Sequence, residues 1–138
     1  MRNSATVKFS SLSENEGFAR MAAAAFVSPL DPTLETLSDI KTAVSEAVTN
    51  AIIHGYEGSS GIVSMNMSIS ENIISITVSD KGRGIEDIKK AMTPLYTSKP
   101  DMERSGMGFT VLESFMDTLE VNSKPGFGTT VKMTKRIL

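Results

Sequence analysis

Two side chains suited to phosphoryl transfer lie four residues apart in the stretch EAVTN, which contains Glu46 and Asn50. Residues at this spacing share one flank of a helix. A carboxamide oxygen is a hard, neutral ligand for Mg²⁺, and a carboxylate can take the proton of an attacking hydroxyl. His54, the only histidine, follows at the same spacing. A single histidine near a helix end is more often a structural hydrogen-bonding residue, so it receives no catalytic role. Solvated polar side chains explain the three residues about equally well.

A carboxylate also follows an apolar strand in SITVSDKGRGIED, residues 75–87. Apolar side chains occupy every second position up to Val78, and Asp80 continues that parity toward the interior. A buried carboxylate needs hydrogen-bond donors, so Asp80 either caps the following turn or accepts a ligand. From this segment alone the turn is favoured, with Gly82 and Gly84 supplying positive φ angles.

A third segment, ERSGMGF at residues 103–109, places Gly106 and Gly108 at the expected start of a helix. Free backbone N–H groups and the positive end of the helix dipole accept a phosphate at such a position. Taken alone, the G-x-G spacing is weak evidence for a nucleotide site.

The hydrophobic pattern predicts two helices in the first half of the chain. Ser13 and Glu16 have the spacing of a helix N-terminus, and the first helix is expected to bury Phe18, Met21, Ala22, Ala25 and Phe26. A longer helix is expected from about Thr33, with Gly55 as its C-terminal stop. Its apolar face comprises Leu37, Ile40, Val44, Ala47, Val48 and Ala51.

Strands are expected at residues 5–10, in a hairpin of GIVSMNMSIS and NIISITVS connected by Glu71 and Asn72, and at 120–123 and 129–135 around the turn KPGFG. A helix through Phe109, Leu112 and Phe115 precedes the last two strands. Residues 86–105, termed the lid, are polar and interrupted by prolines, as in functional or mobile connections. This order predicts an α/β fold, a two-layer sandwich whose mixed, mostly antiparallel sheet is covered on one face by helices.

The composition limits the protein to one domain, residues 1–138. A net charge of −2 gives no basic field for direct nucleic acid binding. The absence of cysteine excludes disulfides and thiolate metal sites. The longest apolar run, residues 21–27, is too short to span a membrane, and no signal peptide is evident. A cytoplasmic protein is therefore expected.

Taken together, these segments match the pattern E-x-x-x-N, D-x-G-x-G, G-x-G-F and G-T-x in order over nearly the whole chain. The sequence thus resembles the nucleotide-binding (GHKL, or Bergerat) fold shared by DNA gyrase, heat-shock 90 chaperones, histidine kinases and MutL-type repair proteins. Within it, SENE-F-AR, LDPT, DIKTAVSEAVTNAIIHGY and SKPDMERSGMGF resemble the anti-sigma serine kinases of spore-forming bacteria. The short loop YEGSSG and residues Lys81 and Arg83 depart modestly from that family.

The resemblance implies an ATP or ADP site with Mg²⁺. Asp80 would accept a hydrogen bond from the exocyclic amine of adenine, supported by Thr129, while Gly82 and Gly84 let the backbone approach the nucleotide. Asn50 would bind Mg²⁺. Around the phosphates, the resemblance implies contacts from Arg104, Ser105, Gly106, Met107 and Gly108. A phosphate contact by Lys99 is left open, since a solvated residue is the favoured interpretation.

The resemblance also implies partners. The family holds the sporulation sigma factor F inactive and phosphorylates a serine of an anti-anti-sigma STAS-domain protein, for which Glu46 would be the base and Arg104 the γ-phosphate contact. Glu14, Glu16 and Arg20 would contact a partner, although a solvated Glu16–Arg20 pair explains two of them. A homodimer is implied as well.

Two other functions stay open. One is a sigma-binding module that uses ATP only as a structural ligand and needs no base. The other is a detached histidine-kinase ATPase domain, disfavoured because no phospho-accepting helix is present.

Overall fold

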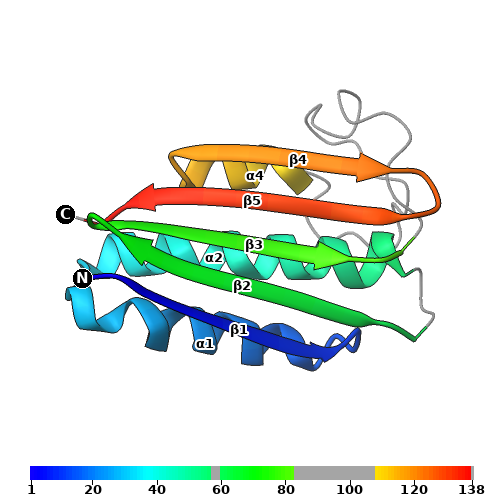
Figure 1. Cartoon of the computed structure of the whole chain (residues 1–138), viewed down its shortest axis with the longest axis horizontal. Helices are drawn as coiled ribbons and strands as arrows, with labels where there is room; N and C mark the ends of the chain where they lie inside the picture. The colour runs from blue at the N-terminus through cyan, green and yellow to red at the C-terminus, as the bar shows by residue number, and fades with distance from the viewer. Residues whose placement is uncertain (57–59, 83–107, 138) are drawn as a thin grey trace.

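The structure is a computed structural model that describes residues 1–56, 60–82 and 108–137 (Figure 1). The predicted lid, residues 86–105, lies outside the described residues. The elements follow in the order β1 (Asn3–Ser10), α1 (Asn15–Val27), a 3₁₀ turn η1 (Ser28–Leu30), α2 (Leu34–Asn50), a π-helical segment η2 (Ala51–Gly55), β2 (Ile62–Ser70), β3 (Ile73–Asp80), α4 (Gly108–Phe115), β4 (Thr118–Lys124) and β5 (Gly128–Arg136).

The five strands form one sheet in the order β1-β2-β3-β5-β4. The helices lie on one face of this sheet (Figure 1), which confirms the two-layer α/β sandwich. Each neighbouring pair of these described strands is antiparallel, so the sheet is not mixed. The predicted hairpin between β2 and β3 is also confirmed. Glu71 and Asn72 have φ angles of 52° and 64°, as a two-residue hairpin turn requires.

The core lies between the sheet and the helices. Strands β2 and β3 bury alternate side chains toward the helices, and α2 contributes the predicted apolar face, with Leu37 partly buried. The largest fully buried side chains are Ile40, Met65, Met67, Ile74, Ile76, Leu112 and Met133. The central strand β3 therefore ends inside the protein, which brings Asp80 to the edge of the core.

The buried face of α1 differs from the predicted one. Ala19, Ala23 and Val27 are fully buried, whereas Phe18 and Met21 are 51% and 59% exposed. Ala25 is also exposed, while Ala22 and Phe26 are partly buried. The small residues Ala19 and Ala23, one helical turn apart, allow α1 to approach its neighbours closely, which favours this face over one with larger side chains.

The N-terminus of α1 also differs from the prediction. Glu14 is the N-cap and makes no side-chain capping hydrogen bond. Glu16, which the capping box would have used, pairs instead with Arg20. On α2, by contrast, Thr33 is the N-cap, and its hydroxyl accepts a hydrogen bond from the backbone N–H of Thr36 at 3.1 Å.

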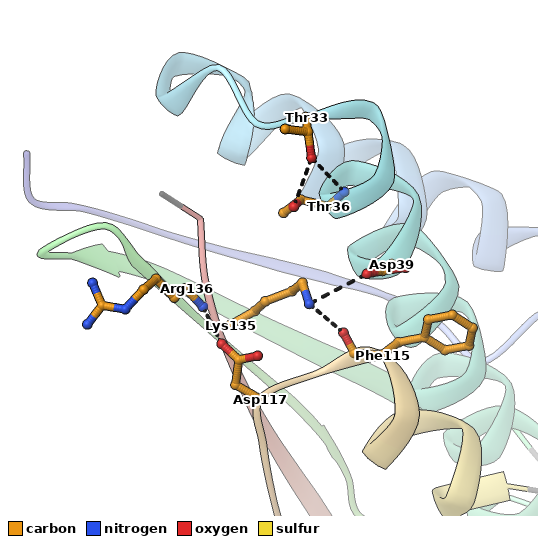
Figure 2. A network of polar contacts seen from close by, with 7 residues as sticks. All are labelled: Thr33, Thr36, Asp39, Phe115, Asp117, Lys135 and Arg136. Carbon is orange, nitrogen blue, oxygen red and sulfur yellow. Dashed lines mark hydrogen bonds and ion pairs between the residues drawn. The ribbon is translucent and has the colours of Figure 1, made fainter.

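One lysine connects the two layers near the N-terminal half of α2 (Figure 2). Lys135 of β5 donates to the Phe115 carbonyl at the end of α4 at 3.0 Å and lies 3.5 Å from the Asp39 carboxylate of α2. The lysine satisfies an orphan carbonyl of α4 and, through Asp39, holds α2 against the sheet.

Candidate nucleotide-binding site

Asp80 is buried, with 8% of its surface exposed, as its parity on β3 predicts. Its Oδ1 atom accepts a hydrogen bond from the Gly82 backbone N–H at 2.9 Å, which is the predicted Asx-type turn. Burial raises the pKa of Asp80 above its ordinary value, and backbone hydrogen bonds from Gly82 and Thr129 oppose that rise. A desolvated carboxylate therefore ends β3.

Three glycines pack closely against Asp80 or against one another at this position. A Cβ atom on Gly55 would lie 2.8 Å from Asp80 Oδ1, and one on Gly128 would lie 2.1 Å from the Asp80 carbonyl oxygen. A Cβ atom on Gly82 would lie 1.8 Å from the Gly55 carbonyl oxygen. Any side chain at these positions would displace backbone or the Asp80 side chain.

The predicted reason for Gly82 is wrong. Gly82 does not have a positive φ angle, and glycine is required because the backbone of Gly55 lies against it. Gly55 is the last residue of η2, so the predicted stop is confirmed, although its φ angle is not positive as at many helix C-termini. Gly84 lies outside the described residues.

Thr129 is buried beside Asp80 and pairs with it in register across β3 and β5. The Ser123 hydroxyl donates to the Gly128 carbonyl and lies 2.9 Å from the Thr129 hydroxyl. Because a hydroxyl has one proton, Thr129 is the donor in this pair. The side chain is therefore fixed next to the carboxylate, where the sequence places it.

Helix α2 changes its winding directly after Asn50, where the π-helical segment η2 begins. In such a segment the hydrogen bonds span five residues, and single π turns are frequent at functional sites. Glu46 and Asn50 share a flank of the regular helix, as predicted. His54 lies in the wider turn, so the regular four-residue spacing does not extend to it. Both Glu46 and Asn50 are partly exposed.

The end of η2 contacts β3 and β5, so the C-terminal end of α2, the end of β3 and the start of β5 lie at the same end of the molecule (Figure 1, right). Gly108 begins α4, as predicted. The other predicted phosphate contacts, Arg104, Ser105, Gly106 and Met107, lie outside the described residues, as does Lys99.

Tyr56 was not predicted as a site residue, but its side chain connects the start of β2 to the residue that follows β3. Its hydroxyl donates to the Ile62 carbonyl at 2.7 Å and accepts from the Lys81 backbone N–H at 2.9 Å. The ring lies against Gly61, where a Cβ atom would be 2.2 Å from a ring carbon. In the sequence, only the position of this tyrosine, directly after Gly55 and five residues before Gly61, could have indicated its role.

The predicted docking residues lie on α1. Glu14 is exposed, whereas Glu16 and Arg20 form the intrahelical ion pair at 2.9 Å that the sequence left as an alternative. Arg20 also approaches the Ser45 hydroxyl of α2 at 3.4 Å. Glu16 and Arg20 therefore face the groove between α1 and α2 and not the fully exposed side of α1.

Comparisons with known proteins identify the family and the fold. The sequence matches the histidine kinase-like ATPase domain family over residues 9–135. A crystal structure of the RsbU and RsbW domains of a Mycobacterium tuberculosis protein has a similar fold, with a TM-score of 0.72 at 17% identity. The alignment covers 98% of this chain and 32% of that one, and at this identity it supports the fold alone. The fold is thus that of a histidine kinase-like ATPase domain.

Similar curated proteins identify a particular family within this class of ATPase domains. Anti-sigma F factors are 58% identical in Clostridium beijerinckii, 59% in a Thermoanaerobacter species and 55% in Bacillus cereus. These alignments cover 97–98% of this chain and 93–94% of the relatives. The chain belongs to the anti-sigma F factor family. Among the described residues, no helix is long and apolar enough to cross a membrane.

Proposed function

We propose that the protein is an anti-sigma factor that binds and inhibits the sporulation sigma factor F, and that it also acts as an ATP- and Mg²⁺-dependent serine kinase. Its protein substrate would be the anti-anti-sigma STAS-domain antagonist, inactivated by phosphorylation. The observation that carries the enzymatic part is the buried Asp80 carboxylate at the end of β3, which lies against Gly55 of η2, the segment that directly follows Asn50.

The residues present fit an adenine nucleotide. An ionised carboxylate can accept hydrogen bonds but cannot donate them, so Asp80 suits the exocyclic amine of adenine, which is a donor. Thr129, fixed by Ser123, would support the base on the same side. Gly82 would let the backbone approach the nucleotide, and Gly84 would do the same. At the phosphates, backbone N–H groups at the start of α4, where Gly108 is the first helical residue, would donate hydrogen bonds to the oxygen atoms.

A magnesium site of the kind used in phosphoryl transfer needs few protein ligands. The described residues include no group of three or more His, Cys, Asp or Glu that could hold a metal ion. Mg²⁺ is commonly bound by one or two protein oxygens together with substrate phosphates, and the Asn50 carboxamide can supply one of them. When bound, the ion offsets the charge of the phosphates.

The protein would then position the serine hydroxyl and the phosphates and accept the proton of the hydroxyl. Glu46 lies one helical turn before Asn50. A serine hydroxyl next to Glu46 would therefore face the phosphates of a nucleotide whose Mg²⁺ is bound by Asn50. The Glu46 carboxylate would accept the hydroxyl proton as the oxygen attacks. Arg104 would contact the γ-phosphate, where a guanidinium matches the oxygen geometry.

The exposed face of α1 supports partner binding. Phe18 and Met21 are more than half exposed there, and Glu14 lies at the start of the helix. Apolar side chains next to charged ones are typical of protein interfaces. We infer that the sigma factor contacts this face and Glu14, and that it reaches Glu16 and Arg20 at the adjoining groove between α1 and α2. The protein is further proposed to form a homodimer.

The kinase is tested by incubating the protein with radiolabelled ATP, Mg²⁺ and the STAS-domain protein. In the variant Glu46→Gln, transfer should fall by roughly 10² to 10⁴, because the carboxamide cannot accept the proton. ATP binding and ATP-dependent sigma binding should persist. The matched control is Glu35→Gln, an exposed glutamate in the first turn of the same helix.

A second candidate function is the sigma-binding module that uses ATP only to shape its surface. No transfer by the wild-type protein, with sigma binding intact, would favour that module. Transfer by Glu46→Gln within a few-fold of wild type would instead show that the serine needs no carboxylate base, which a loose transition state permits.

A further inference from the structure

A groove of about 450 Å³ lies between α1 and α2. One wall is the Glu16–Arg20 pair of α1. The other is a stripe of α2 formed by Leu34, Leu37, Ser38, Lys41, Thr42, Ser45 and Glu46. The groove therefore begins at the N-terminus of α2 and extends along the helix to the side chain proposed as the base.

The α2 wall continues toward the candidate nucleotide site. Ser38, Thr42 and Glu46 are four residues apart, and Asn50 is next on the same line. Four residues of α-helix advance about 6 Å, so the groove reaches Glu46 about 6 Å before the residue proposed to bind Mg²⁺. A chain segment lying in the groove would point toward the phosphates.

The chemistry of the groove changes along its length. Leu34, at the outer end, is 85% exposed and lies near Leu37. In the middle, Lys41 forms no salt bridge with any residue in the described ranges, whereas the charge of Arg20 is offset by Glu16 at 2.9 Å. An occupant that carries an apolar side chain and then a carboxylate would match this order.

From these features we propose that the groove binds the serine-bearing segment of the protein substrate, with Lys41 pairing with an acidic side chain near the serine. This proposal rests on the kinase function proposed above. Lys41 precedes Glu46 by five residues, or about 7.5 Å of helix. An extended strand advances about 3.3 Å per residue, so the acidic side chain lies about two residues from the serine. The apolar side chain lies about three residues further, opposite Leu34.

The test is steady-state phosphorylation of the STAS-domain protein by wild type and by Lys41→Glu. The variant should raise KM for the protein substrate about tenfold or more with kcat within a few-fold, since a docking contact contributes equally to ground and transition states. Lys41→Arg should keep most of the wild-type KM. The matched control is Lys8→Glu, an exposed lysine on β1, and it should leave KM unchanged. Replacing the substrate's acidic residue by lysine should restore binding to Lys41→Glu.

ADP affinity and the thermal midpoint of Lys41→Glu should equal those of wild type, which excludes a general loss of structure. Phosphorylation with an unchanged KM would overturn the groove proposal alone, because the kinase would still be present. Weakened sigma binding at an unchanged KM would assign the groove to the sigma factor and overturn it as well. Absence of transfer by the wild-type protein would refute the kinase function, and the groove proposal with it.

Discussion

The substitution Asp80→Asn separates a binding role of this carboxylate from a structural one. The change keeps the size of the side chain and an oxygen that can still accept from the Gly82 N–H. It removes the acceptor-only character, since the carboxamide also presents donors. Leaving the adenine amine facing a donor costs about 1 to 3 kcal/mol. The Kd for ADP should therefore rise about 5- to 150-fold.

The stability of the nucleotide-free protein should change in the opposite direction. Burial raises the pKa of Asp80 in the folded state. A raised carboxyl pKa contributes stability that is present below the unfolded pKa and is lost as pH rises through the folded pKa. At neutral pH the ionised Asp80 is thus a cost to folding, and Asp80→Asn should keep or raise the thermal midpoint.

Isothermal titration with ADP, and thermal melting with and without ADP, measure both effects. The control is Asp117→Asn, an exposed aspartate that accepts from the Arg136 backbone N–H at the other end of the sheet (Figure 2). Wild-type ADP affinity in Asp80→Asn would remove Asp80 from the site. A large drop in the melting temperature without nucleotide would instead show that the carboxylate is structural.

Three further outcomes are expected. ADP affinity should fall on acidification as Asp80 protonates, at a higher pH than for an ordinary aspartate because its pKa is raised, and an Asp80→Asn titration that follows the same curve would contradict this. Gly82→Ala should cost about 1 to 3 kcal/mol or more of unfolding free energy, because the new Cβ atom meets the Gly55 carbonyl, whereas Gly17→Ala, with only ordinary contacts, should be neutral or stabilising in a denaturant titration. Arg20→Glu should weaken sigma binding and make it less salt-dependent, with ADP affinity unchanged and with Arg136→Glu as control; an equal loss of ADP binding would indicate misfolding.

Sequence reasoning was most reliable where one pattern had one structural solution. The apolar face of α2 and the Glu71–Asn72 turn are both confirmed, because a long 3.6-residue period and a two-residue connection each leave few alternatives. The prediction for α1 placed its largest apolar side chains, Phe18, Met21 and Phe26, on the buried face. Periodicity does not reveal how closely two elements approach, and the close contact favours Ala19 and Ala23 over Phe18 and Met21.

Long-range contacts explain the remaining differences. The role of Gly82 depends on the Gly55 carbonyl, 27 positions earlier in the sequence, and Tyr56 contacts Lys81, 25 positions later. A local reading can recognise a glycine or a tyrosine but not the backbone that packs against it. The π-helical turn after Asn50 is equally hidden, because residues 51–55 fit a regular helix in sequence.

The two interpretations of Asp80 that the sequence opposed, a turn and a ligand contact, are compatible in the structure. An ionised carboxylate offers about four lone-pair sites, and the backbone N–H groups of Gly82 and Thr129 account for two of them. These donors fix the orientation of the carboxylate without exhausting its capacity to accept. These hydrogen bonds also favour the ionised form of Asp80, which burial disfavours, so the side chain can still accept from a donor at neutral pH. Under the proposed function the turn orients Asp80 toward the adenine amine, whereas a residue that only closed the turn could equally be asparagine.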